Sequence, residues 1–269
     1  MVKEMKYSYE YEIKYQEVDV QRKLRLYNLE NYLLEVAGTV ADSLNFGIAR
    51  LHPMGLTWIL TRMSIEMFEL PTHCDRIRIE TWIESSAHML SSRNFRIYKG
   101  EKLIGQVKSV WAVLDMEKRE IANIFNDPIF EGCMDGEVLQ MPRAVRMMAL
   151  PEAPRVPYTI RYSDLDYNRH CNSCKYLQAM LDTYLPEAMV AWQLGQAQGA
   201  IGDLKISRFQ DFKISRFQEA WRLDIHYSRE VHAGEQTSVA WQDEGDLVRY
   251  QMLNSEGLTS CSAALQRVV

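Results

Sequence analysis

The segment Tyr15-Gln16-Glu17-Val18-Asp19 recurs in altered form as Tyr162-Ser163-Asp164-Leu165-Asp166. Each copy forms an acidic turn at the end of a segment whose residues alternate as in a strand, over residues 7–15 in the first half and 156–162 in the second. The repeat therefore predicts two halves built on one plan.

A predicted amphipathic helix follows each acidic turn. Apolar residues recur at helical spacing over residues 29–40 in the first half and 176–185 in the second. The residues expected to begin and end these helices are Asn28 and Gly47 in the first half, and Asn172 or Ser173 with Pro186 in the second.

Strand-like segments follow each helix. They cover residues 56–69, 76–84, 93–98 and 102–114 in the first half, and 221–229, 236–242, 247–253 and 258–268 in the second. One helix followed by several antiparallel strands, twice over, predicts an α+β protein in which each sheet wraps around its helix. The apolar seam between helix and sheet either holds an alkyl chain or is ordinary core.

Proline and glycine cluster between Asp127 and Pro157, where no periodic segment fits. We therefore predict an N-terminal domain over residues 1–126, a linker over 127–155 and a C-terminal domain over 156–269.

The composition excludes several classes of protein. The 269 residues are 47% hydrophobic and carry a formal charge of −5, so we expect no nucleic-acid partner. No apolar run approaches the roughly 18 residues of a membrane span, and the N-terminus has no signal-peptide pattern. We expect a cytoplasmic protein without a membrane span.

The five cysteines do not suggest a disulfide framework, because their number is odd and their spacing wide. Cys171 and Cys174 form one CxxC pair, which is either a redox or metal motif or two small residues at a helix start. A zinc site would normally need a second Cys or His pair. We expect no metal and no cofactor.

The richest stretch in functional groups is Asp164-Leu165-Asp166-Tyr167-Asn168-Arg169-His170-Cys171-Asn172-Ser173-Cys174-Lys175-Tyr176. Asp166, Asn168 and His170 are spaced by two, which places them on one side of an extended segment. Backbone N–H groups at the following helix start can hold an oxyanion. The alternative is a network that only caps a turn.

This stretch resembles a signature of the acyl-acyl carrier protein thioesterases, Asp-Leu-Asp-x-Asn-x-His-x-Asn-Asn-x-x-Tyr. A second block of that family, Tyr-x-Arg-Glu-Cys, is similar to Tyr227-Ser228-Arg229-Glu230-Val231. The first signature is matched at Asp164, Leu165, Asp166, Asn168, His170, Asn172 and Tyr176, and is not matched at Ser173.

The resemblance implies a tandem double hot-dog fold and hydrolysis of fatty acyl-acyl carrier protein to free fatty acid, which terminates chain elongation. The implied partner is an acyl carrier protein that bears the acyl chain. A homodimer stays an open expectation. The implied catalytic residues are Asp166, Asn168, His170 and Glu230. The cysteine of the second block is Val231 here, and valine cannot act as a nucleophile.

The internal repeat gives an independent comparison. It places Gln21 opposite Asn168, Lys23 opposite His170, and Leu70 opposite Glu230. The first half therefore keeps the frame but lacks the imidazole and the second carboxylate. We expect chemistry in the second half, and acyl binding or scaffolding in the first.

Two mechanisms and two other functions stay open from the sequence. Glu230 and His170 activate water, or Asp166 attacks the carbonyl carbon to form an anhydride, while Asn168 orients the thioester or helps to hold the oxyanion. The other functions are hydrolysis of acyl-coenzyme A and acyl-chain binding without turnover.

Docking of an acidic carrier protein requires a local basic patch, because the chain itself is acidic. A short repeat, residues 205–210 and 213–218, contributes four of the candidates. The full set is Arg155, Arg161, Arg169, Lys175, Lys205, Arg208, Lys213 and Arg216.

Overall fold

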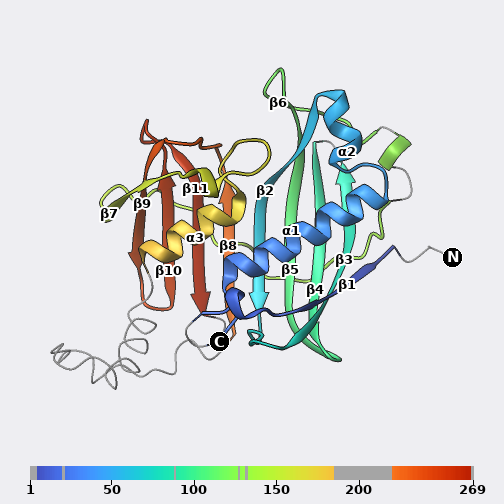
Figure 1. The fold of residues 1–269 in the computed structure, drawn as a ribbon, viewed down its shortest axis with the longest axis horizontal. Helices are drawn as coiled ribbons and strands as arrows, with labels where there is room; N and C mark the ends of the chain where they lie inside the picture. Colours follow the sequence, from blue (N-terminus) through green and yellow to red (C-terminus); the bar gives the residue numbers. More distant parts are fainter. Residues whose placement is uncertain are drawn as a thin grey trace. The chain divides into compact units, whose positions relative to one another are not determined.

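The structure is a computed structural model that describes residues 5–19, 22–87, 89–126, 128–130, 133–184 and 220–267. The chain divides into two compact units. The first consists of Met1–Arg146 with Asp224–Ser228, and the second of Met147–Leu223 with Arg229–Val269. Each unit contains a helix beside antiparallel strands (Figure 1), as the sequence predicted.

In the first unit the strand order is β1-β3-β4-β5-β2, and β6 pairs with β5. Neighbouring strands are antiparallel, with register pairs such as Tyr9 with Ile79. The predicted strands are found, although β1 is shorter than expected because a 3-10 turn, Tyr15–Glu17, follows it. The bounds are β1 Tyr7–Glu12, β2 Leu56–Met67, β3 Arg76–Ala87, β4 Leu90–Lys99, β5 Lys102–Asp115 and β6 Glu120–Ile121.

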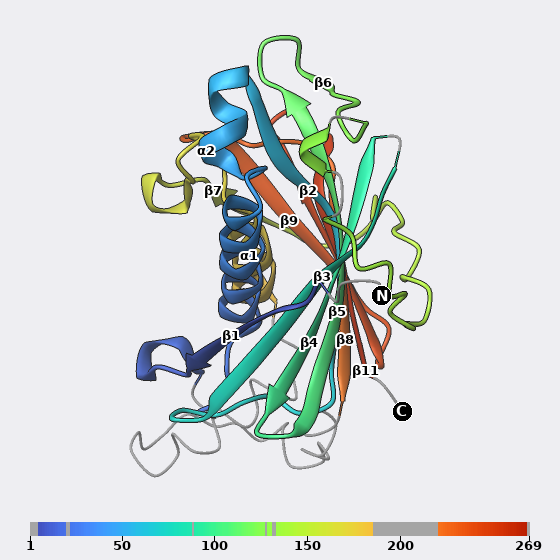
Figure 2. The ribbon, with the colours of Figure 1, turned by 90° about the vertical axis from the view of Figure 1, so that its right-hand side faces the viewer.

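Helix α1, Leu26–Ser43, lies along one face of the first unit's strands (Figure 2). Its face toward the sheet is apolar and buried, and this face includes Leu29, Leu33, Val36 and Val40. The helical spacing of these residues explains both the helix and its side of burial.

The predicted ends of α1 are wrong by a few residues. The helix begins after Arg25 rather than Asn28, because the Asn28 side chain donates a hydrogen bond to the Glu17 carbonyl oxygen at 2.9 Å. It ends at Ser43 with Leu44 as its C-cap, and Gly47 instead precedes a short helix, α2, Ile48–Leu51. A Cβ at Gly47 would lie 2.7 Å from the Asp42 backbone nitrogen, so a residue with a side chain would clash with the main chain at this turn.

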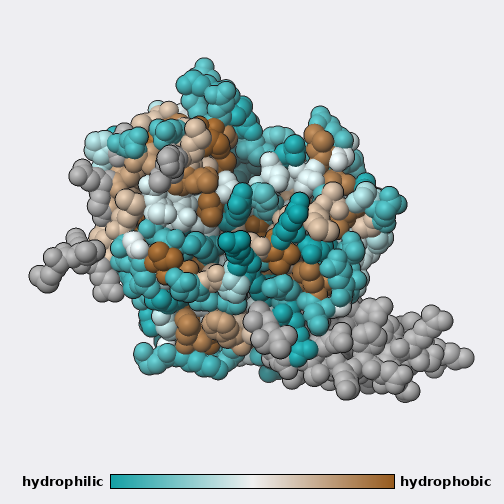
Figure 3. Space-filling model, turned by 180° about the vertical axis from the view of Figure 1, so that it is seen from behind, coloured by the Kyte–Doolittle hydropathy of each residue, from teal (hydrophilic) through white to brown (hydrophobic). Residues whose placement is uncertain are grey.

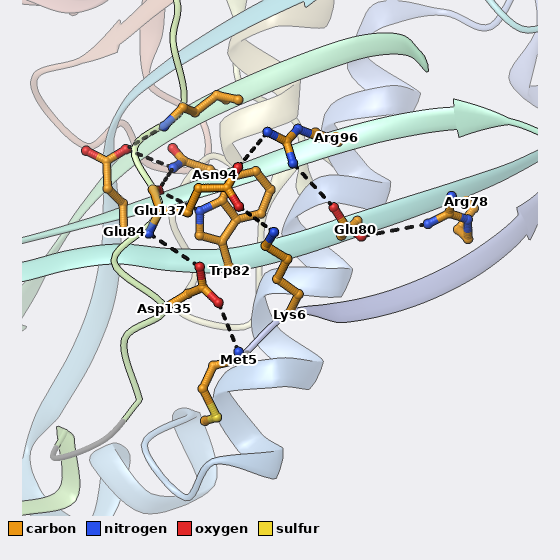
Figure 4. Close-up of polar contacts among 11 residues, drawn as sticks. Met5, Lys6, Arg78, Glu80, Trp82, Glu84, Asn94, Arg96, Asp135 and Glu137 are labelled. Atoms are coloured by element: carbon orange, nitrogen blue, oxygen red, sulfur yellow. Dashed lines mark hydrogen bonds and ion pairs between the residues drawn. The ribbon is translucent and has the colours of Figure 1, made fainter. Parts of the chain in front are cut away.

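The start of the predicted linker lies against the strands of the first unit (Figure 4). Glu137 anchors it, because its carbonyl oxygen accepts a hydrogen bond from Trp82 Nε1 at 2.8 Å and its carboxylate one from Arg96 at 2.6 Å. Asp135 accepts a hydrogen bond from the Met5 backbone N–H at 3.0 Å. Residues 133–154 contain no helix or strand.

A segment distant in sequence completes the first unit. The buried Asp224 carboxylate accepts hydrogen bonds from Ser64 Oγ at 2.5 Å and from the Val145 N–H at 3.0 Å. The Tyr227 hydroxyl donates one to the buried Glu30 carboxylate at 2.6 Å. These bonds attach Asp224–Ser228 to the first unit.

In the second unit the strand order is β11-β10-β9-β7, and β8 begins in this unit with Trp221–Leu223, whereas its remaining residues belong to the first unit. The register of β10 with β11 and β9 is antiparallel, and the predicted strand boundaries hold within two residues except in β7, which ends at Thr159 rather than Tyr162 because a 3-10 turn begins at Tyr162. The bounds are β7 Arg155–Thr159, β8 Trp221–Tyr227, β9 Gln236–Asp243, β10 Leu247–Leu253 and β11 Thr259–Arg267.

Helix α3, Ser173–Thr183, buries Leu177 and Met180 in the second unit. Asn172 is its N-cap, and the Asn172 side chain accepts a hydrogen bond from the Cys174 N–H at 3.3 Å. This cap confirms one of the two predicted choices. The expected stop at Pro186 lies outside the described residues.

Among the helices of the described residues, none has both the length and the apolar composition that a membrane span requires. The face seen in Figure 3 mixes hydrophilic side chains with separate hydrophobic patches. The short repeat of residues 205–210 and 213–218 lies outside the described part of the chain.

Candidate active site

A tight turn, rather than an extended segment, carries the predicted site residues. Leu165 and Cys171 form an antiparallel bridge, and the Asp166 N–H donates a hydrogen bond to the His170 carbonyl oxygen at 2.8 Å. Arg169 adopts a φ of 67°, which reverses the chain. The expectation that Asp166, Asn168 and His170 line one side of an extended segment is therefore wrong.

The Asp166 carboxylate closes this turn from within. Its Oδ1 atom accepts hydrogen bonds from the Asn168 N–H at 2.8 Å and from the His170 N–H at 3.1 Å. A short carboxylate that binds N–H groups two and four residues onward is a common way to fix a turn. The turn-capping network that the sequence allowed is present.

The first unit contains the same turn. Val18 and Leu24 form the corresponding bridge, and Asp19 Oδ1 accepts a hydrogen bond from the Lys23 N–H at 3.0 Å. Arg22 adopts a φ of 62°. The aspartate is thus a feature of both halves, and Lys23 occupies the place that His170 takes in the second unit.

A second segment completes each turn in the same way. His170 bridges His232 in the second unit, and Lys23 bridges Thr72 in the first. The Cys171 N–H donates to the Val231 carbonyl oxygen at 2.8 Å, as the Leu24 N–H does to the Pro71 carbonyl oxygen at 2.8 Å. Counting back two residues from Thr72 and His232 places Leu70 opposite Glu230, as the repeat predicted.

His170 and Glu230 meet at this junction. His170 Nδ1 lies 3.3 Å from Glu230 Oε1, and the two side chains are 24% and 26% exposed. The pair is thus partly shielded from water but still accessible to a substrate. The structure brings these two predicted residues together from a turn and a strand end 60 positions apart.

The hydroxyl of Tyr176 on α3 fixes the segment after β8 that carries Glu230. It donates a hydrogen bond to the Arg229 carbonyl oxygen at 3.3 Å. Asn168, the remaining predicted residue, lies half-buried at the tip of the turn. Tyr176, a matched position of the signature, therefore belongs to the frame around the His170–Glu230 pair.

His232 was not among the predicted residues. Its ring centre lies 5.0 Å from that of His170, with the two planes at 73°. Its spacing of two from Glu230 in an extended segment was the signal that placed both on one side of the chain.

The start of α3 is less available to an oxyanion than the sequence suggested. The Cys174 N–H already donates to Asn172 Oδ1 at 3.3 Å, and the Lys175 N–H to the Asn172 carbonyl oxygen at 2.8 Å. These two amide groups are therefore engaged within the chain.

The CxxC pair consists of two buried free thiols. Burial, with the nearby charges of Asp164 and Asp166, raises the pKa of the Cys171 thiol to about 12. The Cys174 thiol donates to Asn172 Oδ1 at 2.8 Å. Since the thiolate is the reactive form, Cys171 is not suited to nucleophilic attack.

Comparison with known structures defines the fold class. An acyl-ACP thioesterase from Bacteroides thetaiotaomicron aligns with a TM-score of 0.79 and 24% identity over 97% of both chains. A 12:0-ACP thioesterase from Umbellularia californica aligns with a TM-score of 0.76 and 17% identity, over 97% of this chain and 96% of that one. The fold is a hot-dog fold with two units.

Family models identify the chain more closely. The model of the acyl-ACP thioesterase N-terminal domain matches residues 4–131, and that of the C-terminal domain matches residues 149–198. The chain belongs to the acyl-ACP thioesterase family.

Plant relatives agree with this membership. An oleoyl-acyl carrier protein thioesterase of Coriandrum sativum is 25% identical over 71% of this chain and 57% of its own length. An acyl-[acyl-carrier-protein] hydrolase of Cuphea viscosissima is 28% identical over 68% of this chain and 48% of its own. The chain spans about half the length of these relatives.

The burial of the cysteines predicts a simple labelling pattern. Of the five thiols, only that of Cys74 is exposed, so a maleimide should rapidly modify one thiol in the folded protein. Mass spectrometry of the labelled peptides measures this. Cys74→Ser should remove the rapid phase, whereas rapid labelling of Cys171 would contradict its assignment as an inert core residue.

Proposed function

We propose that this protein hydrolyses the thioester of fatty acyl-acyl carrier protein and releases the free fatty acid, which terminates chain elongation. The observation that carries the proposal is the 3.3 Å contact between His170 Nδ1 and Glu230 Oε1 in the second unit. At the equivalent positions the first unit has Lys23 and Leu70, which offer neither an imidazole nor a carboxylate. Membership of the thioesterase family supports this reaction class.

The proposed reaction uses the pair to activate water. Glu230 orients the His170 imidazole, and the pair takes a proton from a water molecule whose oxygen attacks the thioester carbon. The carbon–sulfur bond then breaks, and the thiolate of the carrier's prosthetic group leaves and receives the proton. A thiolate is a good leaving group, so one acid–base pair is sufficient.

Asn168 and Asp166 have supporting roles in this proposal. The Asn168 carboxamide orients the thioester or donates a hydrogen bond to the developing oxyanion. Asp166 is a positioning residue, because its carboxylate holds the N–H groups of Asn168 and His170. The presence of the same bond at Asp19, in the unit without the pair, supports a structural role over direct attack.

The first prediction concerns His170. Fatty acid release from a panel of acyl-acyl carrier proteins should fall at least about a hundredfold in His170→Ala, as is typical for loss of a general acid–base group. Lys23→Ala is the matched control, because Lys23 occupies the same turn position in the first unit. That control should keep wild-type rates.

The same panel separates the two other functions. If the wild type releases nothing from any carrier-bound chain but hydrolyses acyl-coenzyme A, the substrate class is wrong. If it binds acyl chains and hydrolyses neither, the protein is an acyl-binding protein and the catalytic assignment fails.

The second prediction separates the two roles of Asp166. An amide oxygen can still accept the turn's N–H bonds, so Asp166→Asn should keep activity within about tenfold, while Asp166→Ala should lower stability by about 1–2 kcal/mol and lose activity. Chemical denaturation and initial rates measure both quantities. Asp19→Ala should show a similar stability loss with little change in rate.

The opposite outcome identifies a nucleophile. If Asp166→Asn folds with wild-type stability and loses activity as completely as His170→Ala, the carboxylate itself takes part in the reaction.

The two units divide the work in this proposal. The first unit keeps the frame and either binds the acyl chain or acts as a scaffold. If it binds the acyl chain, α1 with its buried apolar face is the element that contacts it. Photo-crosslinking from the tail of a carrier-bound acyl chain tests this, since labels confined to the second unit would limit the first to scaffolding. The boundaries 1–126, 127–155 and 156–269 stay a prediction.

The third prediction concerns docking of the acyl carrier protein on the second unit. Arg161 and Lys175 line one surface hollow, and Arg155 is exposed nearby in sequence. An acidic carrier would be attracted to these charges, so Arg155→Glu with Arg161→Glu should raise KM by about tenfold at low salt and leave kcat nearly unchanged. Lys118→Glu, in the first unit, is the control, and an unchanged KM in the double variant would place docking elsewhere.

A further inference from the structure

In the second unit, the turn that carries His170 meets the segment that carries Glu230 and His232, and these three side chains form a candidate metal site. One ring nitrogen each of His170 and His232 and one oxygen of Glu230 lie within 4.8 Å of one another. Two imidazoles and one carboxylate are a set that Zn²⁺ takes in proteins, with water in the fourth position. We propose that His170, Glu230 and His232 bind a zinc ion.

The backbone brings these ligands together before any ion binds. His170 and His232 are directly opposite in an antiparallel bridge, which places their Cβ atoms about 5 Å apart. Val231, which lies between Glu230 and His232 in the sequence, is fully buried. Its two neighbours therefore project to the opposite side of the segment. The three ligands therefore share one face.

The distances fit a tetrahedral ion after a small movement. Zinc bonds of about 2.0–2.1 Å separate neighbouring ligand atoms by roughly 3.4 Å. His170 Nδ1 and Glu230 Oε1 are already 3.3 Å apart. The remaining ligand, His232, is exposed, so its ring can rotate toward the pair without disturbing the core.

The first unit provides an internal comparison. Lys23, Leu70 and Thr72 stand at the positions of His170, Glu230 and His232. None of these three side chains is a usual zinc ligand, so the set is specific to the second unit. The sequence predicted no metal because the Cys171–Cys174 pair had no second Cys or His pair to complete a zinc site.

A bound ion would inhibit the proposed hydrolysis. Zinc bound to His170 Nδ1 and to a Glu230 oxygen would replace the contact by which Glu230 orients the imidazole, and the positive ion would make the ring a weaker base toward water. This inhibitory role rests on the proposed function, whereas the binding of zinc does not.

The test compares the metal-free full-length protein with His232→Gln. Calorimetric titration with Zn²⁺ and visible absorption with Co²⁺ should show one ion per wild-type chain. His232→Gln should bind at least about tenfold more weakly, keep basal hydrolysis and lose inhibition by zinc. Thermal unfolding verifies that the variant is folded.

A control removes another histidine that lies close to a metal-binding group. His73 Nδ1 lies 3.3 Å from the exposed Cys74 thiol, and this contact could hold an ion weakly. His73→Gln should leave the measured affinity unchanged if the ion is held at His170, Glu230 and His232.

The outcomes distinguish the two proposals. Absence of saturable zinc binding in the wild type, or equal affinity in His232→Gln, overturns the metal site. Faster hydrolysis with zinc overturns its inhibitory role. Zinc binding that depends on His232, in a protein that hydrolyses no carrier-bound chain, supports the metal site while the proposed function fails.

Discussion

The site depends on one hydrogen-bonding arrangement. In it, an aspartate carboxylate accepts a hydrogen bond from the backbone N–H four residues onward. Asp166 does so at 3.1 Å in the second unit and Asp19 at 3.0 Å in the first. Each closes a turn, which a partner segment then bridges. Because buried backbone groups must be paired, this frame fixes where the side chain at the fourth position stands.

The two units show how function can differ on one frame. The bridge partners are Lys23 and Thr72 in the first unit, and His170 and His232 in the second. The two units differ at three equivalent positions, one of which is Leu70 in the first unit and Glu230 in the second. These differences give the second unit an imidazole–carboxylate pair on the same turn. Because the turn also forms in the first unit, which lacks the imidazole–carboxylate pair, the frame does not depend on the residues that carry the chemistry.

The sequence predicted α1, α3, most of the strand segments along the chain and the equivalence of the two halves, because periodicity and turn residues determine these locally. It failed at the start of α1, where the tertiary bond from Asn28 to Glu17 replaces a cap. It also took the signature for an extended segment, since the left-handed backbone of Arg169 leaves no mark in residue type. His232 was missed because its partner is distant in sequence.

The central claim is that the His170–Glu230 pair activates water while Asp166 holds the turn. Single-turnover hydrolysis in isotopically labelled water, followed by mass spectrometry of the product and of the enzyme's peptides, tests it most directly. The account predicts label in the released fatty acid and none in Asp166 or Glu230. Label in either carboxylate would show covalent attack by the enzyme and contradict the account.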